Sequence, residues 1–410
     1  MSESRYWKFM EQARWYAGKS RGGVPAEFRA LGWYTPADAE PRVRSELVRV
    51  VYPGGDSEWY HLPVSYRDRP LASCLLAETP DGFAHDATAD PEAMTAILAA
   101  MGRGLDGEGF TCHSRGAEQL EPELPPRRYG GEQSNTSVFF GDRAMLKFFR
   151  KLEPGRNLDV ELHEALAGTG VAARLYGWIE GPGADLAMLV ESLPRPEDGY
   201  VLACASLSRG FTAEAAELGR ALARTHETLR ERLGEASGAG TELSAQFAAR
   251  ACEIATEAEP LAGHLGALLA RYAQISEHDF PTQRIHGDFH LGQALHTGDG
   301  WRIVDFEGEP MKTMAERRAM DSPWRDVAGL LRSLDYAAAT GDGLDTATWR
   351  TAARDAFLFS YCEAMGTQPS PLLSAYELDK AVYEVRYELR NRPQLVDIPL
   401  SFIIRTLKEN

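Results

Sequence analysis

The chain has 410 residues, of which 44% are hydrophobic and 25% are charged, and this composition is typical of a globular, water-soluble protein of two or three domains. Its net charge of −16 argues against nucleic acid as a partner, because no stripe of Lys and Arg could offset the repulsion from phosphate. Five scattered cysteines, no apolar leader and no membrane-length apolar run predict a reduced, cytoplasmic protein with no membrane partner.

The first part of the chain predicts an α/β domain. Residues 6–16 have a helical pattern, and residues 47–52 and 59–64 predict two strands joined by the turn at 53–56. Asp90 as the N-cap and Pro91 at the first helical position predict a helix over 90–101. The prolines between 119 and 128 indicate a linker, so residues 1–118 are expected to form a domain of their own.

Residues 130–149 have the pattern of a nucleotide-binding sheet. Residues 130–140 predict a strand, a polar turn and a second strand, and the turn can present the hydroxyls of Ser134 and Thr136 to phosphate oxygens. Lys147 lies in the apolar strand 144–149, where a buried ammonium group needs an anion. Glu161, on the predicted helix 158–167, is the expected partner that would hold Lys147 against the nucleotide. A lysine that reaches solvent at a sheet edge is the other interpretation.

After residue 186 the pattern changes from strand to helix. Residues 186–190 predict a short strand, and the prolines that follow suit a hinge at which adenine could bond to the backbone. The remainder predicts helices over 212–234, 241–256, 260–275, 322–340, 346–364 and 371–390. A small β-rich lobe over 119–193 and a large helical lobe over 194–410 are therefore expected.

Asp288, Gln293 and Asp305 carry the groups that phosphoryl transfer requires. Residues 293–297 and 301–305, joined by turn residues, predict a hairpin that places Gln293 directly opposite Asp305. The amide oxygen and the carboxylate could then hold one magnesium ion. Asp288, just before the hairpin, is the candidate base that receives a hydroxyl proton.

Two later segments are candidates for supporting this site. Arg325 and Asp326, in the first turn of a predicted helix capped by Ser322, are expected to brace the loop around Asp288. Residues 383–393 mix aromatic and charged side chains at helical spacing, which indicates either a sugar-binding face or a solvated helix face.

Several segments together resemble a known family. They are EQSNTS (132–137), HGDFHLGQ (286–293), DFEGEP (305–310), Arg317-Arg318 with Asp321-Ser322-Pro323, and YELDKAVYE (376–384). Across residues 130–405 the chain resembles actinobacterial maltokinases and the closely related glucosamine kinases. The resemblance implies an α+β, bilobal eukaryotic-kinase-like (aminoglycoside phosphotransferase-like) fold in which residues 1–118 form an N-terminal α/β cap domain.

The resemblance also implies a role for each matched residue. Asp288 would be the catalytic base, with ATP and Mg²⁺ as cofactors and Gln293 and Asp305 as the metal ligands. The nucleotide would be bound by Ser134, Thr136, Lys147, Glu161, Met188, Val190 and Glu191. The sugar would be bound by His290, Glu384, Tyr387 and Arg392.

Two departures from the family pattern concern the substrate. Leu395 stands where maltokinases have a Trp, and Asp397 stands where they usually have a Pro. Losing an aromatic platform weakens the case for a second glucose unit, and the added carboxylate of Asp397 could bind an amino group. We therefore expect a monomeric kinase that transfers the γ-phosphoryl group of ATP to an alcohol group of glucosamine, giving glucosamine 6-phosphate.

Three alternatives remain open. The first is a maltokinase that forms maltose 1-phosphate. The second is an aminoglycoside phosphotransferase, whose cationic substrates suit an acidic chain. The third is a non-catalytic nucleotide-binding regulator, which would be expected to lack at least one of Lys147, Asp288, Gln293 and Asp305.

Overall fold

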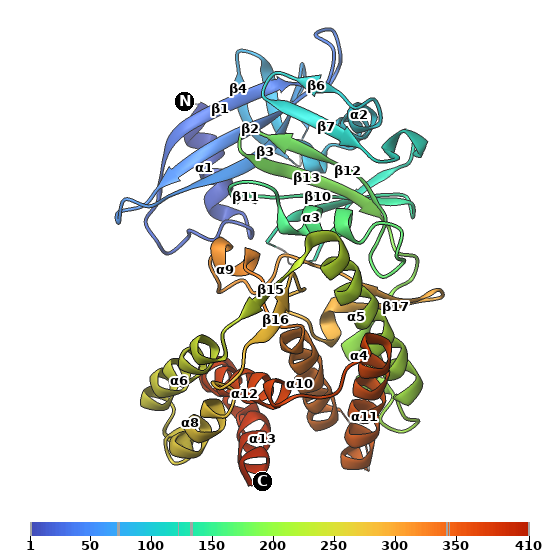
Figure 1. Ribbon diagram of the computed structural model, residues 1–410. Helices are drawn as coiled ribbons and strands as arrows, with labels where there is room; N and C mark the ends of the chain where they lie inside the picture. Colours follow the sequence, from blue (N-terminus) through green and yellow to red (C-terminus); the bar gives the residue numbers. More distant parts are fainter. Residues whose placement is uncertain are drawn as a thin grey trace. The chain divides into compact units, whose positions relative to one another are not determined.

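The computed structural model describes residues 2–71, 74–121, 123–131, 134–341, 343 and 345–408. The chain folds into two compact units (Figure 1). Unit 1 comprises Met1–Glu164 and Ala173–Pro194, and unit 2 comprises Ala165–Ala172 and Arg195–Asn410.

The first sheet of unit 1 is antiparallel and has the order β1-β2-β3-β5-β4, with β11 paired to β3. Its strands are β1 (Val24–Trp33), β2 (Arg42–Val51), β3 (Ser57–Arg67), β4 (Leu75–Thr79), β5 (Gly82–Asp86) and β11 (Lys151–Leu152). Helix α1 (Ser2–Gln12) places Tyr6 and Met10 in its aromatic core. The predicted hairpin at 47–64 is confirmed, since β2 and β3 pair from Arg42↔Tyr66 to Val51↔Ser57.

The second sheet of unit 1 has the order β6-β7-β12-β13-β10-β9-β8. Its strands are β6 (Asp106–Gly107), β7 (Phe110–Ser114), β8 (Pro126–Arg128), β9 (Thr136–Phe140), β10 (Ala144–Phe148), β12 (Leu175–Gly181) and β13 (Ala184–Glu191). The helical segments are η1 (Ala87–Ala89), α2 (Pro91–Gly102), η2 (Ala117–Gln119) and α3 (Leu158–Ala165). Asp90 caps α2 as predicted, because its side chain accepts from Ala93 N.

Two features of this sheet differ from the sequence pattern. The strand that precedes the polar turn is β8, earlier than the predicted one, and it pairs with β9. Residues 132 and 133 of that motif lie outside the described residues. Strands β6 and β7, from the segment expected in the cap, pair into this sheet through β12, since backbone pairing depends on the partner strand and not on local composition.

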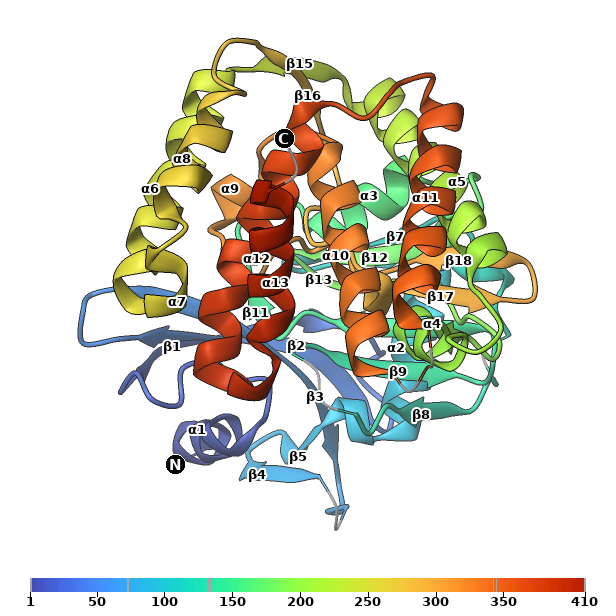
Figure 2. The ribbon, with the colours of Figure 1, turned by 90° about the horizontal axis from the view of Figure 1, so that it is seen from below.

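Unit 2 is largely helical. Its helices are α4 (Gly199–Ala205), α5 (Thr212–Leu233), α6 (Gly240–Glu257), α7 (Glu259–Ala262), α8 (Leu265–Ala273), α9 (Met314–Arg318), α10 (Trp324–Thr340), α11 (Thr346–Met365), α12 (Pro371–Asn391) and α13 (Asp397–Lys408). Its short segments are β14 (Glu197–Asp198), β15 (Glu235–Gly238), β16 (Phe280–Gln283), η3 (Leu291–Gln293), β17 (Ala294–Thr297), β18 (Gly300–Ile303) and η4 (Pro393–Leu395). Helix α12 packs against both α10 and α13, and Figure 2 shows these three helices from below.

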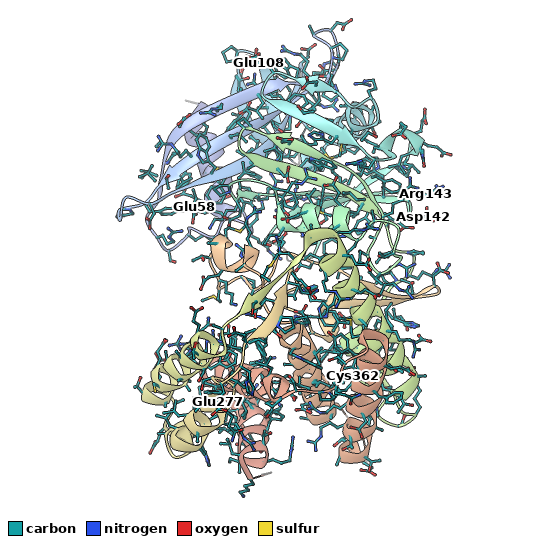
Figure 3. All side chains as sticks on the ribbon, viewed as in Figure 1. Glu58, Glu108, Asp142, Arg143, Glu277 and Cys362 are labelled. Atoms are coloured by element: carbon teal, nitrogen blue, oxygen red, sulfur yellow. The ribbon has the colours of Figure 1, made fainter. Side chains whose placement is uncertain are left out.

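The helix predictions for unit 2 are mostly confirmed. The helix predicted over 260–275 is two helices, α7 and α8, and the sequence pattern missed α4, α9 and α13. Among the described residues no disulfide is formed, and Cys362 of α11 is buried (Figure 3). Within the same part of the chain, no helix combines the length and the apolar character needed to cross a membrane.

The predicted register of the 293–305 hairpin was wrong by one residue. Strands β17 and β18 pair from Ala294↔Ile303 to Thr297↔Gly300, so Gly298 and Asp299 form a two-residue loop. Gln293 consequently lies opposite Val304, whose N–H donates to the Gln293 carbonyl at 3.0 Å. The prediction centred the turn on Asp299, whereas a two-residue loop has its centre between residues.

Candidate active site

The loop that carries Asp288 is held by its backbone. The N–H groups of His286 and Gly287 each donate to the carboxylate of Asp326 at 2.8 Å, and the side chain of His226 approaches the same carboxylate at 3.0 Å. Asp326 is buried in the first turn of α10. The predicted bracing role of Asp326 is therefore confirmed. Arg325 instead forms ion pairs with Asp321 and Glu309.

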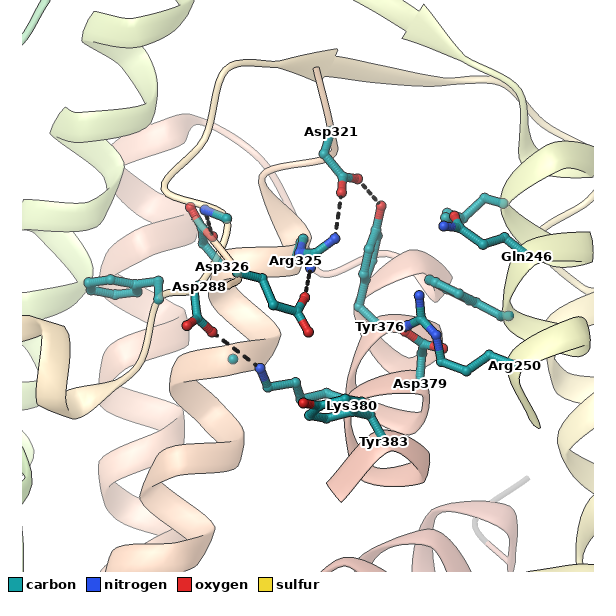
Figure 4. Close-up of a pocket in the computed structure, with 16 residues that line it drawn as sticks. Gln246, Arg250, Asp288, Asp321, Arg325, Asp326, Tyr376, Asp379, Lys380 and Tyr383 are labelled. Atoms are coloured by element: carbon teal, nitrogen blue, oxygen red, sulfur yellow. Dashed lines mark hydrogen bonds and ion pairs between the residues drawn. The ribbon is translucent and has the colours of Figure 1, made fainter. Parts of the chain in front are cut away.

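Asp288 faces a lysine that the sequence analysis did not single out. Lys380 of α12 lies with its Nζ 3.5 Å from Oδ1 of Asp288 (Figure 4). Burial raises the pKa of Asp288, but Lys380, followed by His290 and His286, outweighs it and holds the pKa below its ordinary value. The candidate base is therefore an ionised carboxylate at neutral pH.

A small pocket, part of it open to solvent, lies beside this pair. Its walls come from α6, α10, α12 and the loops at 287–289 and 309–321 (Figure 4). The acidic side chains that line it are Asp288, Glu309, Asp321, Asp326 and Asp379, and the basic ones are Arg250, Arg325 and Lys380. Arg250 pairs with Asp379, and Tyr376 donates to Asp321 at 2.5 Å. The arrangement offers many hydrogen-bonding groups to a small polar ligand.

Gln293 and Asp305 meet despite the shifted register. Asp305, two residues after the end of β18, has a φ of 64°, a left-handed conformation. The amide Nε2 of Gln293 donates to Oδ2 of Asp305 at 3.3 Å. The amide oxygen sits at the same end of the Gln293 side chain, so the pair offers the oxygen ligands that Mg²⁺ prefers. These two residues therefore fit a magnesium site.

In unit 1, Lys147 pairs with an acid that the sequence analysis missed. Its Nζ lies 2.7 Å from Oδ2 of Asp159, two residues before the predicted partner Glu161 on α3. Burial raises the pKa of Asp159, but Lys147 and His163 outweigh it and lower the pKa. Lys147 lies in β10 between Ser137 of β9 and Met188 of β13. The ammonium group of Lys147 is therefore paired with a carboxylate, as its partial burial in an apolar strand requires.

The other predicted nucleotide residues also belong to unit 1. Ser134 is exposed in the polar turn, and Thr136 is buried, with its Oγ1 accepting from Nε of Arg150 at 2.8 Å. Glu161 is partly buried on α3, Met188 and Val190 are buried in β13, and Glu191 is partly buried at the end of that strand. No signal in the sequence distinguished Arg150.

The predicted sugar-binding residues lie elsewhere on unit 2. Glu384 accepts from Arg332 at 2.7 and 3.0 Å, and Arg392 forms an ion pair with Glu388 at 2.5 Å. His290 caps η3, Tyr387 is 43% exposed, and Asp397 is exposed in the first turn of α13. Among the described residues, none of these five lines the pocket beside Asp288. The pocket-lining Asp379, Lys380 and Tyr383 fall within the YELDKAVYE motif, which was the available signal.

Two sequence families match parts of the chain. Residues 126–361 match the phosphotransferase enzyme family, and residues 9–90 match the maltokinase N-terminal cap domain. A glucosamine kinase of Streptacidiphilus jiangxiensis is 27% identical over 324 residues, which cover 65% of this chain and 70% of that protein. A glucosamine kinase of Mycolicibacterium smegmatis is 25% identical over 327 residues, which cover 68% of this chain and 78% of that protein.

The solved structures agree with the fold. A glucosamine kinase in complex with glucosamine, ADP and inorganic phosphate has a TM-score of 0.75 and 22% identity, covering 97% of this chain and 98% of that one. A second crystal form of a glucosamine kinase has a TM-score of 0.76 and 21% identity, covering 98% of this chain and 97% of that one. The expected kinase-like α+β fold with an N-terminal cap is therefore confirmed.

Proposed function

The chain belongs to the phosphotransferase enzyme family, and on that premise we propose that it is an ATP- and Mg²⁺-dependent kinase of an amino sugar, with glucosamine 6-phosphate as its product. The observation that carries the proposal is the ionised Asp288, paired with Lys380 at the wall of a small polar pocket. The curated relatives named above are glucosamine kinases, which supports the same substrate.

The charge of the pocket favours an amino sugar over a neutral one. The five carboxylates and three basic groups named above leave an excess of negative charge beside Asp288. A substrate with an ammonium group compensates such an excess, while maltose does not. Phosphorylation of maltose to maltose 1-phosphate is the second candidate, because residues 9–90 match a cap domain of maltokinases.

In the reaction, Asp288 orients the acceptor hydroxyl of the sugar and receives its proton as that oxygen bonds to the γ-phosphorus of ATP. The bond from the γ-phosphorus to the bridging oxygen of ATP breaks, and ADP leaves. Lys380 keeps the Asp288 carboxylate ionised and holds one of its oxygens in place. Gln293 and Asp305 would hold Mg²⁺, which when bound neutralises charge on the phosphates of ATP.

We assign ATP to residues of unit 1. Lys147, supported by Asp159 and Glu161 on α3, would bind its phosphates together with Ser134 and Thr136. The strand residues Met188, Val190 and Glu191 would receive the adenine. On unit 2 we place the sugar in the pocket beside Asp288. Glu384 would support that pocket through Arg332. His290, Tyr387, Arg392 and Asp397 are proposed to contact the sugar from outside the pocket lining.

The decisive variant is Asp288→Asn, which keeps the shape of the side chain and removes its basicity. We expect kcat for glucosamine to fall by about 10²- to 10⁴-fold, the usual size of general-base catalysis, while the Kd of Mg–ADP stays within about twofold. Glu253→Gln, an exposed change on α6, is the matched control and should leave both values unchanged. Normal turnover by Asp288→Asn would refute the assignment.

The choice of sugar is tested by the release of ADP with glucosamine, glucose and maltose in parallel. We expect the highest kcat/KM for glucosamine, because it is the only one of the three substrates with an ammonium group that can compensate the negative charge of the pocket. A clear preference for maltose would overturn the amino-sugar assignment and favour the second candidate.

A further inference from the structure

The side chain of Arg150 is completely buried in unit 1 and bonds in two directions. Its Nη2 donates to Oδ1 of Asp86 and to Oγ1 of Thr88, both at 3.3 Å, and its Nη1 donates to the carbonyl of His61 at 3.4 Å. These three partners belong to β3, β5 and η1, around the sheet of the N-terminal cap. Its Nε donates in the other direction, to Thr136.

Arg150 lies where the chain passes from one sheet of unit 1 to the other. Lys147 is in β10 of the seven-stranded sheet, and Lys151 begins β11, which pairs with β3 of the cap. The backbone follows the same path, since Phe149 N donates to Leu186 O at 2.9 Å and His61 N donates to the carbonyl of Arg150 at 2.8 Å. The cap and the strand that carries Lys147 are therefore continuous.

The bonds to the polar turn come from both the backbone and the side chain of Arg150. Its N–H donates to Oδ1 of Asn135 at 3.4 Å, and its Nε donates to Oγ1 of Thr136 at 2.8 Å. A hydroxyl that accepts from a guanidinium group keeps its own hydrogen for a further acceptor. Arg150 thus orients a hydroxyl donor next to the exposed Ser134.

The charge of Arg150 is balanced from the cap. Burial lowers the pKa of Arg150, and Asp86, itself buried, is the largest influence that opposes this. Asp86 also pairs with Arg128 at 3.0 Å. The indole ring of Trp15, just after α1, lies 5.0 Å from the guanidinium carbon of Arg150 and covers it. A buried guanidinium group is a rigid fork of donors, so the acceptors around it hold it in one geometry, unlike an ion pair at the surface.

We propose that Arg150 is a positioning residue through which the N-terminal cap holds the turn at 134–136 in the shape that receives the phosphates of the nucleotide. The proposal rests on the proposed function, which assigns this turn to ATP. It makes the cap a part of the nucleotide site, so that a change in the cap, remote in sequence from the turn, alters nucleotide affinity.

The test replaces only the cap residues that accept hydrogen bonds from Arg150. In Asp86→Asn and in the double variant Asp86→Asn/Thr88→Val, Arg150 loses its anion and then its neighbouring hydroxyl, while the turn keeps its sequence. We expect the Kd of Mg–ADP by calorimetry and the KM for ATP to rise at least about fivefold, the lower range of coupling between sites. The KM for glucosamine should stay within about twofold.

Arg128→Gln is the matched control. It removes the other ion pair of Asp86, and the described contacts of the Arg128 side chain include no bond to Asn135 or Thr136. Its Kd for Mg–ADP should match that of the wild type. Arg150→Lys, which keeps the charge but has a single donor group, should weaken Mg–ADP binding as the Asp86 variants do. Circular dichroism and thermal melting verify that each protein is folded.

The outcomes separate this proposal from the proposed function. Folded Asp86 and Arg150 variants that have lower Tm values but bind Mg–ADP like the wild type would show that Arg150 only stabilises the fold, and would overturn the inference. Equal weakening by Arg128→Gln would do the same. A wild-type protein that binds Mg–ADP but phosphorylates no sugar would refute the proposed function, while the binding data would still decide the role of Arg150.

Discussion

Asp288 and Lys380 form the pair on which the chemistry depends. The two residues are 92 positions apart, and their contact at 3.5 Å is weak as a hydrogen bond but close for two opposite charges. Burial raises the pKa of Asp288 and lowers that of Lys380, while their mutual attraction does the opposite in each case. In both groups the effect of neighbouring charges on the pKa exceeds the effect of burial. The Asp288 carboxylate therefore stays ionised while it is partly buried at the pocket wall.

Replacing Lys380 by Met should therefore change the pH profile. Loss of the ammonium group raises the pKa of Asp288, so the acid limb of kcat, which lies below pH 3.8 or is hidden by unfolding in the wild type, should move upward into the measurable range. Steady-state rates between pH 4 and 8 provide the measurement. Lys380→Arg should restore the wild-type profile in part. An unchanged limb in Lys380→Met would contradict this account of the pair.

Asp379 should make the stability of the protein depend on pH. Burial raises its pKa from 3.8 to about 6, against the opposing effect of Arg250. Because the folded-state pKa is the higher one, this group's contribution to stability is complete below pH 3.8 and is lost as the pH rises through about 6. Relative to Asp379→Asn, the wild type should lose Tm between pH 4.5 and 7. Parallel pH dependence of the two proteins would exclude this role.

At the level of single elements, the N-cap of α2 also forms contacts with residues distant in the sequence. Asp90 was recognisable as an N-cap because Pro91 and an apolar run follow it. In the fold, Asp90 also accepts from both Nε and Nη2 of Arg67 on β3, at 2.9 and 2.7 Å, and from Ser65 at 2.7 Å. Its side chain is completely buried, so this cap is also one half of an ion pair whose other half, Arg67, is partly exposed.

The substitution Asp90→Ala should consequently cost more than the loss of a cap. We expect the free energy of unfolding to fall by about 2.5–4 kcal/mol, because the cap contributes about 1 kcal/mol and the hydrogen bonds to the charged carboxylate about 1.5–3 kcal/mol. Thr313→Ala, which removes the exposed capping box of α9, is the control and should cost about 1 kcal/mol. Urea denaturation measures both values. Equal losses in the two variants would show that the pair with Arg67 contributes nothing.

The hairpin β17–β18 shows the limit of local inference within one element. Its turn residues predicted the hairpin and the meeting of Gln293 with Asp305, but not the register. A loop of two residues or of three is compatible with the same composition, and the choice shifts every cross-strand pair by one. Gln293 and Asp305 still meet in the shifted register, and Asp305 has a left-handed backbone conformation at this point.

For the molecule as a whole, nucleotide binding should increase the free energy of unfolding. A nucleotide that binds only the folded chain raises its stability by about 2.7 kcal/mol at one hundred times its Kd. Mg–ADP should therefore raise the Tm, and EDTA should remove most of the increase if Gln293 and Asp305 hold the metal. Asp305→Asn should lose this Mg²⁺ dependence. Asp299→Asn, in the exposed loop of the same hairpin, should keep it. A full response by Asp305→Asn would place the metal elsewhere.

The features that could be predicted from the chain alone are those encoded within a few turns or strands. Periodicity predicted α5, α6, α10, α11 and α12, and the turn residues at 297–300 predicted the hairpin that follows Gln293, because these patterns relate residues that are a few positions apart. Folding was needed to select the partners of individual charged side chains. Lys147 pairs with Asp159, Glu384 pairs with Arg332 outside the pocket, and Arg150 connects Asp86 to Thr136. A buried charged group needs a partner that compensates its loss of hydration. Which groups are buried side by side depends on how separate segments pack, and no local sequence pattern contains that information.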